Sequence, residues 1–453
     1  MLHGRLRPLS SDSAPLARKL TLEPLEPRRL LAIDFELLKD INPTLSPANS
    51  YPSKTAVVGS VLFFTATSPT HGLELWKSDG TETGTVVVKD IGLGTSDASF
   101  ASLINVSGTL YFVANDGVSG NEIWKSDGTA AGTVIVRDIV AGGMSSSPTE
   151  LTNVDGTLYF VANDGGFNYG LWRSDGTEAG THRIREYISG LTSTAPRYLT
   201  NIGGTLYFRA ADESGLELWK SDGTPLGTYR VKDIRAGEAG SNLRSLINVA
   251  GTLYFVANDF VSGYELWKSD GTGTGTVRVK DIRTEPGASS YPGPLFEFND
   301  FVYFSANDGI SGGELWRSDG TEAGTVRVVE INAITGDFFP GDHINVGGML
   351  YFTADDGVNG RELWKSDGTE AGTAQVKDIR AGEASSTPIF LTEVGGTLYF
   401  VANDGATGGE LWKSDGTSVG TVLVRDIYDV NALSSFPDQL INFSGTLFFT
   451  ALH

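Results

Sequence analysis

The stretch that decides the fold is GTLYFVANDGATGGELWKSDGTSVGTVLVRDI, residues 396–427. Residues 108–139 read GTLYFVANDGVSGNEIWKSDGTAAGTVIVRDI, which is almost the same sequence. The chain has eight tryptophans at intervals of about 48 residues, and each is followed by Lys or Arg and then by Ser-Asp-Gly-Thr. They are Trp76, Trp124, Trp172, Trp219, Trp267, Trp316, Trp364 and Trp412. A fixed period decides an architecture more firmly than local propensity does, so the sequence predicts a repeat protein.

Each repeat reads as a group of short strands. Apolar and polar residues alternate with a period of two, and glycine turns separate the segments. In the last full repeat we expect strands at residues 390–394, 397–402, 410–414 and 421–427, with turns at Asn403-Asp404-Gly405 and Asp415-Gly416. Four antiparallel strands in about 48 residues is typical of one blade of a β-propeller. We therefore predict an all-β fold in which residues 33–453 form a single propeller of four-stranded antiparallel blades.

The two ends of the chain complicate ring closure. Residues 34–41 read as a fourth strand that precedes the first full repeat, and residues 439–451 read as a first and second strand after the eighth. The prediction is eight full repeats plus a partial ninth that is split between the termini. The alternative is that eight complete blades close the ring, with the extra strands at the seam.

Composition narrows the classes of function. The formal net charge is −21 at pH 7, so the protein should repel nucleic acid and anionic membranes. There are no cysteines, which excludes disulfides, thiolate metal sites and cysteine nucleophiles. No apolar run approaches the length of about 20 residues that spans a bilayer. We expect a monomer with no nucleic-acid partner and no membrane span.

Two resemblances point to export. The segment LEPRRLLA, residues 25–32, resembles the Leu-Glu-Pro-Arg-x-Leu-Leu motif near the N-termini of surface and secreted proteins of planctomycete-type bacteria. The recurring ELWKSDGTxxGT resembles the ELWxxDGT repeat family of bacterial surface and secreted proteins, and GTLYFVANDGxxGxELW is distantly similar to the repeat of quinoprotein-type propellers. The first two resemblances imply an exported protein in which residues 1–32 are a disordered targeting segment. None of the three supplies an activity.

The most regular residues of the repeat are expected to be structural. A tryptophan at one position in every blade predicts a wedge between neighbouring blades, although a ring of sugar-stacking platforms is the alternative. Each Ser-Asp-Gly-Thr predicts a turn capped by its own Asp, although calcium binding is the alternative because hard cations take carboxylate oxygens. These acidic residues are Asp79, Asp127, Asp175, Asp222, Asp270, Asp319, Asp367 and Asp415. We expect no cofactor, with calcium as the alternative.

A second regular charge precedes each Leu-Trp or Ile-Trp. This position is Glu in all repeats except the third, where Gly170 stands. If Ser78 pairs with Thr85 across the hairpin, Glu74 should face Lys89. An opposite-charge pair between neighbouring strands stabilises a sheet by roughly 0.2 to 1 kcal/mol. We therefore expect the Glu to fix strand register rather than to act as a catalytic carboxylate.

Variable residues gather in the loops between second and third strands and in the connections between blades, which should share one face. Function usually resides on such loops. This face carries a recurring acidic residue, at Asp116, Asp164, Asp259, Asp308, Asp356 and Asp404, either as a ligand site or as simple turns. We expect an exported, non-enzymatic module that binds a protein or carbohydrate at the cell surface. The alternatives are a propeller enzyme acting on glycosides or polysaccharides, with unique residues at the channel mouth, and a calcium-dependent adhesin.

Overall fold

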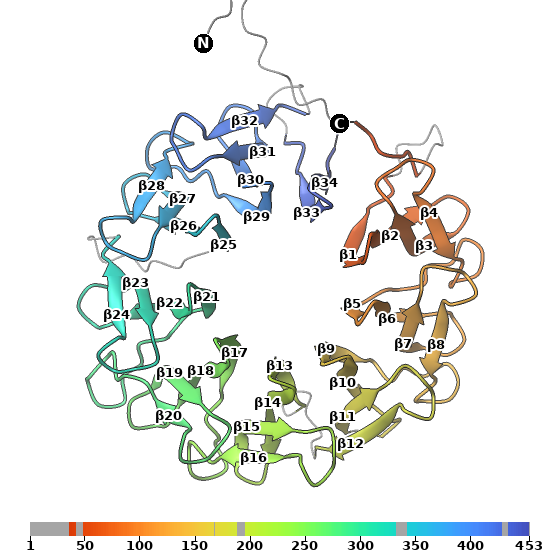
Figure 1. Cartoon of the computed structure of the whole chain (residues 1–453), viewed down its shortest axis with the longest axis horizontal. Coiled ribbons are helices and arrows are strands. Elements are labelled where there is room, and N and C mark those ends of the chain that lie inside the picture. Colours follow the sequence, from red (N-terminus) through yellow and green to blue (C-terminus); the bar gives the residue numbers. More distant parts are fainter. Residues whose placement is uncertain are drawn as a thin grey trace, which may run out of the picture. The chain divides into compact units, whose positions relative to one another are not determined.

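The computed structural model describes residues 36–41, 49–166, 168–187, 195–331, 342–427 and 434–452. Residues 38–453 form one compact unit, and of residues 1–37 only Glu36 and Leu37 are described, neither in a strand. The described residues form 34 strands and no helix, so no helix among them could span a membrane. The strands make eight four-stranded sheets and one two-stranded sheet, arranged in a ring (Figure 1).

The strands occur in the same order in every blade. The first strands are β1 (Ser53–Val58), β5 (Leu103–Val106), β9 (Thr149–Val154), β13 (Arg197–Ile202), β17 (Arg244–Val249), β21 (Phe296–Phe298), β25 (His343–Val346), β29 (Ile389–Val394) and β33 (Asp438–Phe443). The second strands are β2 (Val61–Ser68), β6 (Thr109–Asn115), β10 (Thr157–Asn163), β14 (Thr205–Asp212), β18 (Thr252–Asn258), β22 (Phe301–Asn307), β26 (Met349–Asp355), β30 (Thr397–Asn403) and β34 (Thr446–Thr450). The third strands are β3 (Gly72–Ser78), β7 (Asn121–Ser126), β11 (Tyr169–Ser174), β15 (Gly215–Ser221), β19 (Tyr264–Ser269), β23 (Gly313–Ser318), β27 (Arg361–Ser366) and β31 (Gly409–Ser414). The fourth strands are β4 (Val86–Lys89), β8 (Val134–Arg137), β12 (His182–Glu186), β16 (Tyr229–Lys232), β20 (Val277–Arg278), β24 (Val326–Val329), β28 (Ala374–Lys377) and β32 (Val422–Arg425).

The prediction of eight four-stranded antiparallel blades is confirmed. In each blade the strands pair in sequence order, with the first strand toward the centre of the ring and the fourth toward its outer side (Figure 1). The remaining strands, β33 and β34, form a two-stranded sheet, and β33 lies beside β29 and β1. Residues 34–41 were expected to form a strand. Residues 34–35 lie outside the described part, and residues 36–41 form none.

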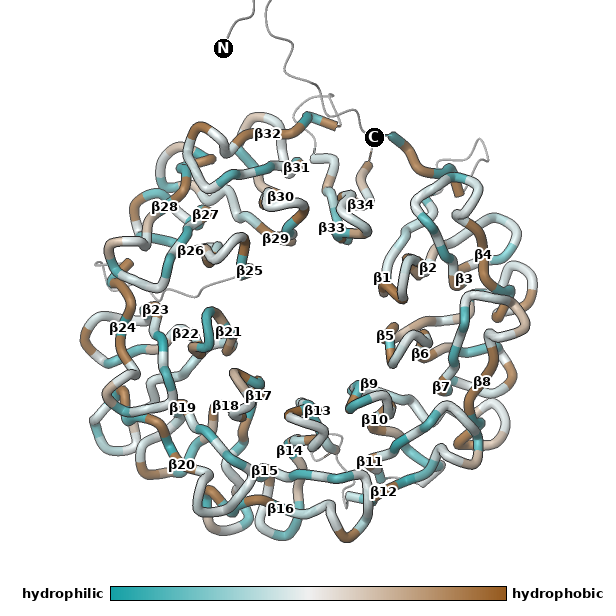
Figure 2. The backbone as a smooth tube through the Cα atoms, in the orientation of Figure 1, coloured by the Kyte–Doolittle hydropathy of each residue, from teal (hydrophilic) through white to brown (hydrophobic). Residues whose placement is uncertain are grey.

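The core lies between neighbouring blades because both faces of each second strand are apolar. Along β6, Leu110 and Phe112 pack against the first blade, whereas Tyr111 and Val113 pack against the third. Apolar residues also recur on the outer strands β4, β8 and β24 (Figure 2). A blade is therefore buried on both faces along its second strand. Its fourth strand is less covered: in β4, Val88 is buried but Val86 is exposed.

The tryptophans lie at these interfaces. Trp124 is only 6% exposed and packs with Phe63 and Leu75 of the preceding blade. Seven of the tryptophans pack in this way on the blade before them, and Trp76 packs with Phe443 of the β33–β34 sheet. The ring places each indole ring where the preceding blade covers it, and not on the outer surface.

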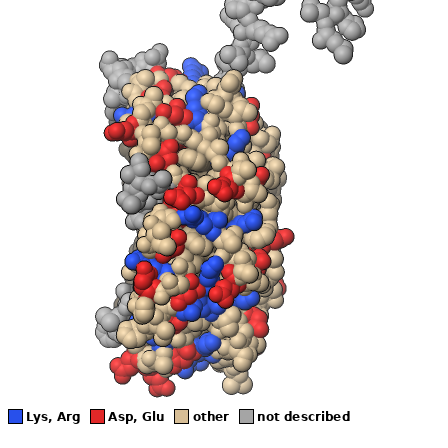
Figure 3. Space-filling view, turned by 90° about the vertical axis from the view of Figure 1, so that its left-hand side faces the viewer, with Lys and Arg blue, Asp and Glu red and all other residues tan. Residues whose placement is uncertain are grey.

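Two sets of hydrogen bonds fasten neighbouring blades together. Lys77 Nζ donates to the carbonyl of Gly128 at 2.8 Å, and Lys89 Nζ donates to the carbonyl of Thr133 at 2.7 Å. The first bond recurs from Lys125 to Gly176, Arg173 to Gly223, Lys220 to Gly271 and Lys365 to Gly416. The second recurs from Arg137 to Thr181, Arg185 to Thr228, Lys232 to Thr276, Lys280 to Thr325 and Lys377 to Thr421. On the outer side shown in Figure 3, basic and acidic side chains are interspersed.

The expected pairing of Glu74 with Lys89 is wrong. A register shift between Leu75 and Trp76 places Leu75, not Glu74, opposite Lys89. Glu74 is instead fully buried and accepts the backbone N–H groups of Ile91 at 3.0 Å and Gly92 at 2.7 Å. Burial raises the pKa of Glu74 to about 7. The glutamate therefore anchors the chain that leaves the fourth strand, and the lysine donates a hydrogen bond to the next blade.

Candidate ligand-binding face

The turns between third and fourth strands use their own polar groups. Asp127 Oδ1 accepts the N–H of Thr129 at 2.8 Å and its hydroxyl at 2.7 Å, and these bonds lower the pKa of Asp127. Gly128 has a φ of +87°, a conformation that favours glycine. The eight equivalent turns make the same bonds from Asp to Thr. Each turn is thus capped from within. Among the described residues there is no cluster of three acidic or histidine side chains that could hold a metal ion.

The opposite face is built from the loops between second and third strands and from the connections between blades. The N–H of Asn121, which follows the loop of the second blade, donates to Ser145 Oγ in the following connection at 2.9 Å. Gly120 lies so close to this connection that a Cβ there would meet the Met144 carbonyl oxygen at 2.5 Å. The two kinds of segment therefore form one continuous surface, which we call the loop face.

The structure does not gather the predicted acidic residues of the loop face into one site. Asp116 Oδ1 accepts the N–H groups of Val118 at 2.9 Å and Ser119 at 2.7 Å, within its own loop. Asp259, Asp308, Asp356 and Asp404 cap their loops in the same manner. Asp164 differs because it forms an ion pair with Arg183. Each carboxylate therefore has a partner within its own blade, and all of these residues except Asp164 cap their loops.

The inner rim of the loop face is where the repeat breaks. The second residue of six innermost strands has a positive φ and a side chain larger than hydrogen, and each differs from the others: Lys54, Glu150, Tyr198, Ser245, Phe390 and Gln439. All six lie at register shifts in the pairing of the first and second strands. Bulges of this kind redirect side chains and are frequent next to functional sites. A backbone with positive φ at residues other than glycine persists where the surrounding structure enforces it. The rim therefore presents side chains of different chemistry from one rigid backbone position.

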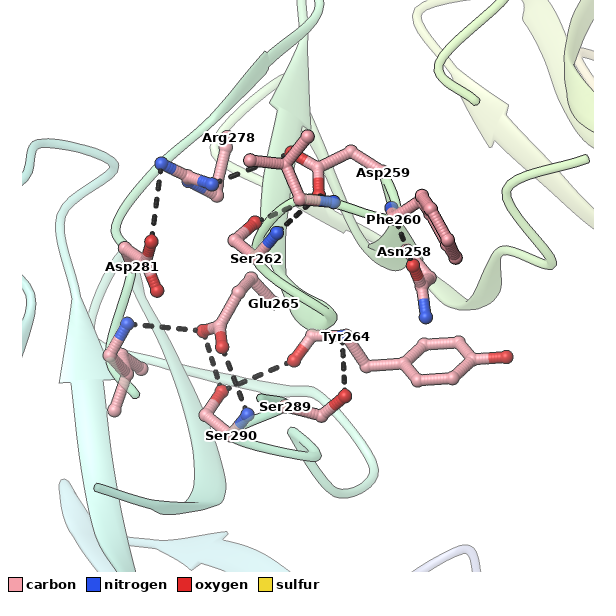
Figure 4. Close-up of polar contacts among 12 residues, drawn as sticks. Asn258, Asp259, Phe260, Ser262, Tyr264, Glu265, Arg278, Asp281, Ser289 and Ser290 are labelled. Carbon is pink, nitrogen blue, oxygen red and sulfur yellow. Dashed lines mark hydrogen bonds and ion pairs between the residues drawn. The ribbon is translucent and has the colours of Figure 1, made fainter. Parts of the chain in front are cut away.

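Three aromatic rings and three arginines meet on one arc of this rim. The guanidinium of Arg244 lies 4.9 Å from the ring centre of Tyr264, and Tyr264 stacks on Tyr291 with ring centres 6.0 Å apart. Figure 4 shows the Tyr264 ring pointing away from the buried Glu265. Tyr291 is 61% exposed. A hollow of about 520 Å³ adjoins these groups, lined by Arg244, Ser245, Ser290, Tyr291, Pro292, Gly293, Pro294, Ser305, Ala306, Asn307 and Gly313.

A second group of the same chemistry adjoins the first. The guanidinium of Arg209 lies 5.0 Å from the ring centre of Tyr198, and Arg209 also donates to the carbonyl of Leu243, the neighbour of Arg244, at 3.3 Å. Burial lowers the pKa of Arg209, and its Nε is buried with no partner among the described residues. Arg197 lies 3.7 Å from the carboxylate of Glu150. We call Arg197, Tyr198, Arg209, Arg244, Tyr264 and Tyr291 the Arg–Tyr cluster.

The Arg–Tyr cluster was missed by the sequence analysis, which followed the recurring residues. The signal is nevertheless present, because Arg209 stands where the other repeats have Thr65, Val113, Val161, Val256, Ser305, Thr353 and Val401. A charged residue at a position that is apolar or small elsewhere marks a departure from the scaffold. What the sequence does not show is that residues from neighbouring blades meet around it.

No family model and no curated protein matches the chain. Among solved structures, the chain is similar to the computationally designed Ika8 protein, with 13% identity, a TM-score of 0.44, and coverage of 81% of this chain and 97% of that one. It is similar to puromycin hydrolase, with 14% identity, a TM-score of 0.39, and coverage of 78% and 58%. It is also similar to the β-propeller domain of the Trilobed protease from Pyrococcus furiosus, with 12% identity, a TM-score of 0.36, and coverage of 84% and 100%. At these identities and scores, the comparisons say nothing about a ligand or a reaction.

Proposed function

We propose that the protein is an exported, non-enzymatic binding module that holds an acidic carbohydrate on the Arg–Tyr cluster of its loop face. The observation that carries the proposal is the juxtaposition of three guanidinium groups and three tyrosine rings beside a hollow. Export is supported by the resemblance of residues 25–32 to an N-terminal motif of exported proteins and of the repeat to the ELWxxDGT family.

The chemistry of the cluster selects the ligand class. Tyrosine rings offer flat apolar faces with a polar tip, which suit the C–H faces of sugar rings. Guanidinium groups bind carboxylates through paired hydrogen bonds. The chain as a whole carries a net charge of −21, so a local excess of arginine is a departure that favours an anion at this place. A polymer of uronic acids combines both features, a sugar ring and a carboxylate on each residue.

The test is binding of the full chain to soluble polyuronates, measured by calorimetry at two salt concentrations. We expect saturable binding that weakens with salt and weakens at least tenfold in Arg244→Ala and in Tyr291→Ala. The matched control is Arg235→Ala, which removes an arginine that lies 4.9 Å from the ring of Phe260 on the loop face but outside the hollow. No binding to acidic glycans, or equal loss in the control, would refute the proposal.

Two further readouts separate this proposal from the alternatives raised by the sequence. Accumulation of new reducing ends during incubation with the polyuronate would identify an enzyme and overturn the non-enzymatic assignment. Binding that disappears on addition of a chelator would identify a calcium-dependent adhesin in place of direct recognition by arginine. We expect neither effect.

A further inference from the structure

The hollow beside Arg244 lies where the sixth blade departs from the repeat. The first strand of this blade, β21, has three residues, whereas the first strands of the other sheets have four or six. The chain before β21 reads Pro292-Gly293-Pro294, and proline has no N–H with which to extend the pairing. The whole connection from the fifth blade, residues 281–294, belongs to the described part of the chain.

One pair of residues decides how much room this position leaves. In the fourth blade Arg197 lies opposite Arg209, so two large side chains stand there. In the sixth blade Ser305 takes the place of Arg209, and the N–H of Gly293 donates to the Ser305 carbonyl at 2.9 Å. Gly293 and Ser305 both line the hollow. The same position of the repeat is therefore filled in one blade and open in the other.

The hollow is lined by polar groups that the fold does not use. Ser305 is only 3% exposed, yet its hydroxyl has no hydrogen-bond partner among the described residues. Asn307 accepts the N–H of Gly309 at 2.7 Å, whereas its Nδ2 is bonded to no described residue. The Ser245 hydroxyl and the Arg244 guanidinium likewise make no hydrogen bond within the described part. Polar groups in such places are usually hydrogen-bonded, so a ligand that enters the hollow can bring hydroxyl groups to them.

The walls of the hollow are flat and apolar. Tyr291, Pro292 and Pro294 provide them. Tyr291 is held in place by stacking on Tyr264, and the N–H of Tyr264 donates to Ser289 Oγ at 2.9 Å (Figure 4). The volume of about 520 Å³ lies in the range of small-molecule sites, which combine apolar walls with a few polar groups. A sugar ring has the matching features, because it carries C–H faces and hydroxyl groups together.

We infer that the hollow receives one sugar ring of the bound polymer, and that Gly293 makes this face select acidic carbohydrate over other polyanions of equal charge. The inference rests on the ligand class proposed for the Arg–Tyr cluster. Arginines alone attract any polyanion, whereas flat walls and hydroxyl groups favour only a ring that fills the space between them. A Cβ at position 293 would lie 2.3 Å from Ser305 Oγ, so any side chain there would displace that hydroxyl and take up part of the hollow.

The experiment compares two polymers on the full chain, polygalacturonate and poly-L-glutamate with the same number of charges. Calorimetry should show that the chain binds polygalacturonate about tenfold more tightly than polyglutamate. In Gly293→Val this preference should fall to about twofold or less, because the valine excludes the ring. The φ of Gly293 lies outside the left-handed region, and the residue before a proline favours the extended backbone that valine adopts, so the backbone does not oppose this substitution.

The matched control is Ala101→Val in the second blade. Ala101 holds the same position of the repeat, since its N–H donates to the Val113 carbonyl at 3.1 Å, and it does not line the hollow. Its preference for polygalacturonate should equal that of the original chain. Ser305→Ala adds no volume and should weaken polygalacturonate binding about threefold with polyglutamate binding unchanged, because one hydrogen bond to the sugar is lost. If Gly293→Val loses both polymers through misfolding, Ser305→Ala decides the question.

The outcomes separate this inference from the proposed function. Equal affinity of the original chain for the two polymers would overturn the inference and leave binding of acidic carbohydrate standing. An unchanged preference in Gly293→Val, or the same loss in Ala101→Val, would overturn the role of Gly293. An equal effect of Ser305→Ala on both polymers would show that no sugar ring lies in the hollow. Absence of polygalacturonate binding to the original chain would overturn the proposed function itself.

Discussion

Replacement of Glu122 by alanine gives a direct measure of how the buried glutamates hold the blades. Glu122 is fully buried, and its carboxylate accepts the N–H of Ile139 at 3.2 Å, the N–H of Ser146 at 2.8 Å and the hydroxyl of Ser146 at 2.6 Å. In Glu122→Ala the two backbone N–H groups lose their acceptor inside the protein. The serine hydroxyl keeps an alternative, because it also lies 3.4 Å from the Asn121 carbonyl.

The expected loss of stability follows from the two N–H donors that are left without an acceptor. A buried donor without an acceptor costs about 1 to 3 kcal/mol, so the variant should lose about 2 to 6 kcal/mol of unfolding free energy at this interface. Glu122→Gln keeps one acceptor oxygen and should lose about half as much. Burial raises the pKa of Glu122, so the comparison is made at a single pH.

Hydrogen exchange is the suitable assay because a ring of blades need not unfold in one step. Exchange at Ile139 and Ser146 should quicken strongly in Glu122→Ala, whereas exchange in the opposite blades stays unchanged. The third blade shows what a replacement requires. There Gly170 stands in place of the glutamate, the strand pairing extends to Glu186, and the N–H of Tyr187 donates to the Tyr169 carbonyl instead. Unchanged exchange in the alanine variant would refute the anchoring role of Glu122.

The remaining predictions concern other contacts between blades. Gly176→Ala should lower the unfolding free energy by about 2 to 4 kcal/mol because its Cβ would collide with the Tyr111 hydroxyl. Gly108 has the same φ of +87° to within a degree but open space around it, so Gly108→Ala should lower the unfolding free energy by only about 1 to 2 kcal/mol. Equal midpoints in denaturant for the two variants would contradict this. Val329→Lys should add the missing bond to the carbonyl of Thr373 and raise the unfolding free energy by about 1 kcal/mol, and a lower midpoint would count against that bond. Burial raises the pKa of Glu265 from 4.5 to about 7, so the stability that its protonated form contributes is fully present below pH 4.5 and is lost as the pH rises through about 7. Melting temperatures measured across this pH range should fall less in Glu265→Gln than in the original protein. An identical pH dependence in both proteins would exclude the effect.

The fold could be predicted from the sequence because the period and the turns are local signals repeated eight times. For the eighth repeat, the four predicted strands differ from β29–β32 by at most two residues at any end. The pairing of Glu74 with Lys89 failed because a single shift between Leu75 and Trp76 moves every later partner by one position. A bulge of one residue changes neither the period nor the composition, so the sequence alone does not reveal it.

The candidate site was less predictable for a different reason. The break of the repeat at Arg209 is visible in the sequence, but its meaning depends on the neighbours that the ring brings to it. Tyr198 comes from the same blade, whereas Leu243 and Tyr264 come from the next. Neighbouring blades place such residues side by side because equivalent positions stack around the ring.

The contrast between recurring and singular residues follows from how the blades are joined. A residue such as Lys77 pairs within its own blade and donates a hydrogen bond to the turn of the next blade, so a substitution there disturbs two blades together. The second residue of each innermost strand is different, because its bulged backbone is fixed by pairing while its side chain is one of six different kinds. Tyr198→Phe, which introduces the side chain that Phe390 has at the equivalent position, should therefore alter ligand binding with little change in stability. The ring separates the two tasks: its interfaces hold the blades, and its inner rim is free to vary.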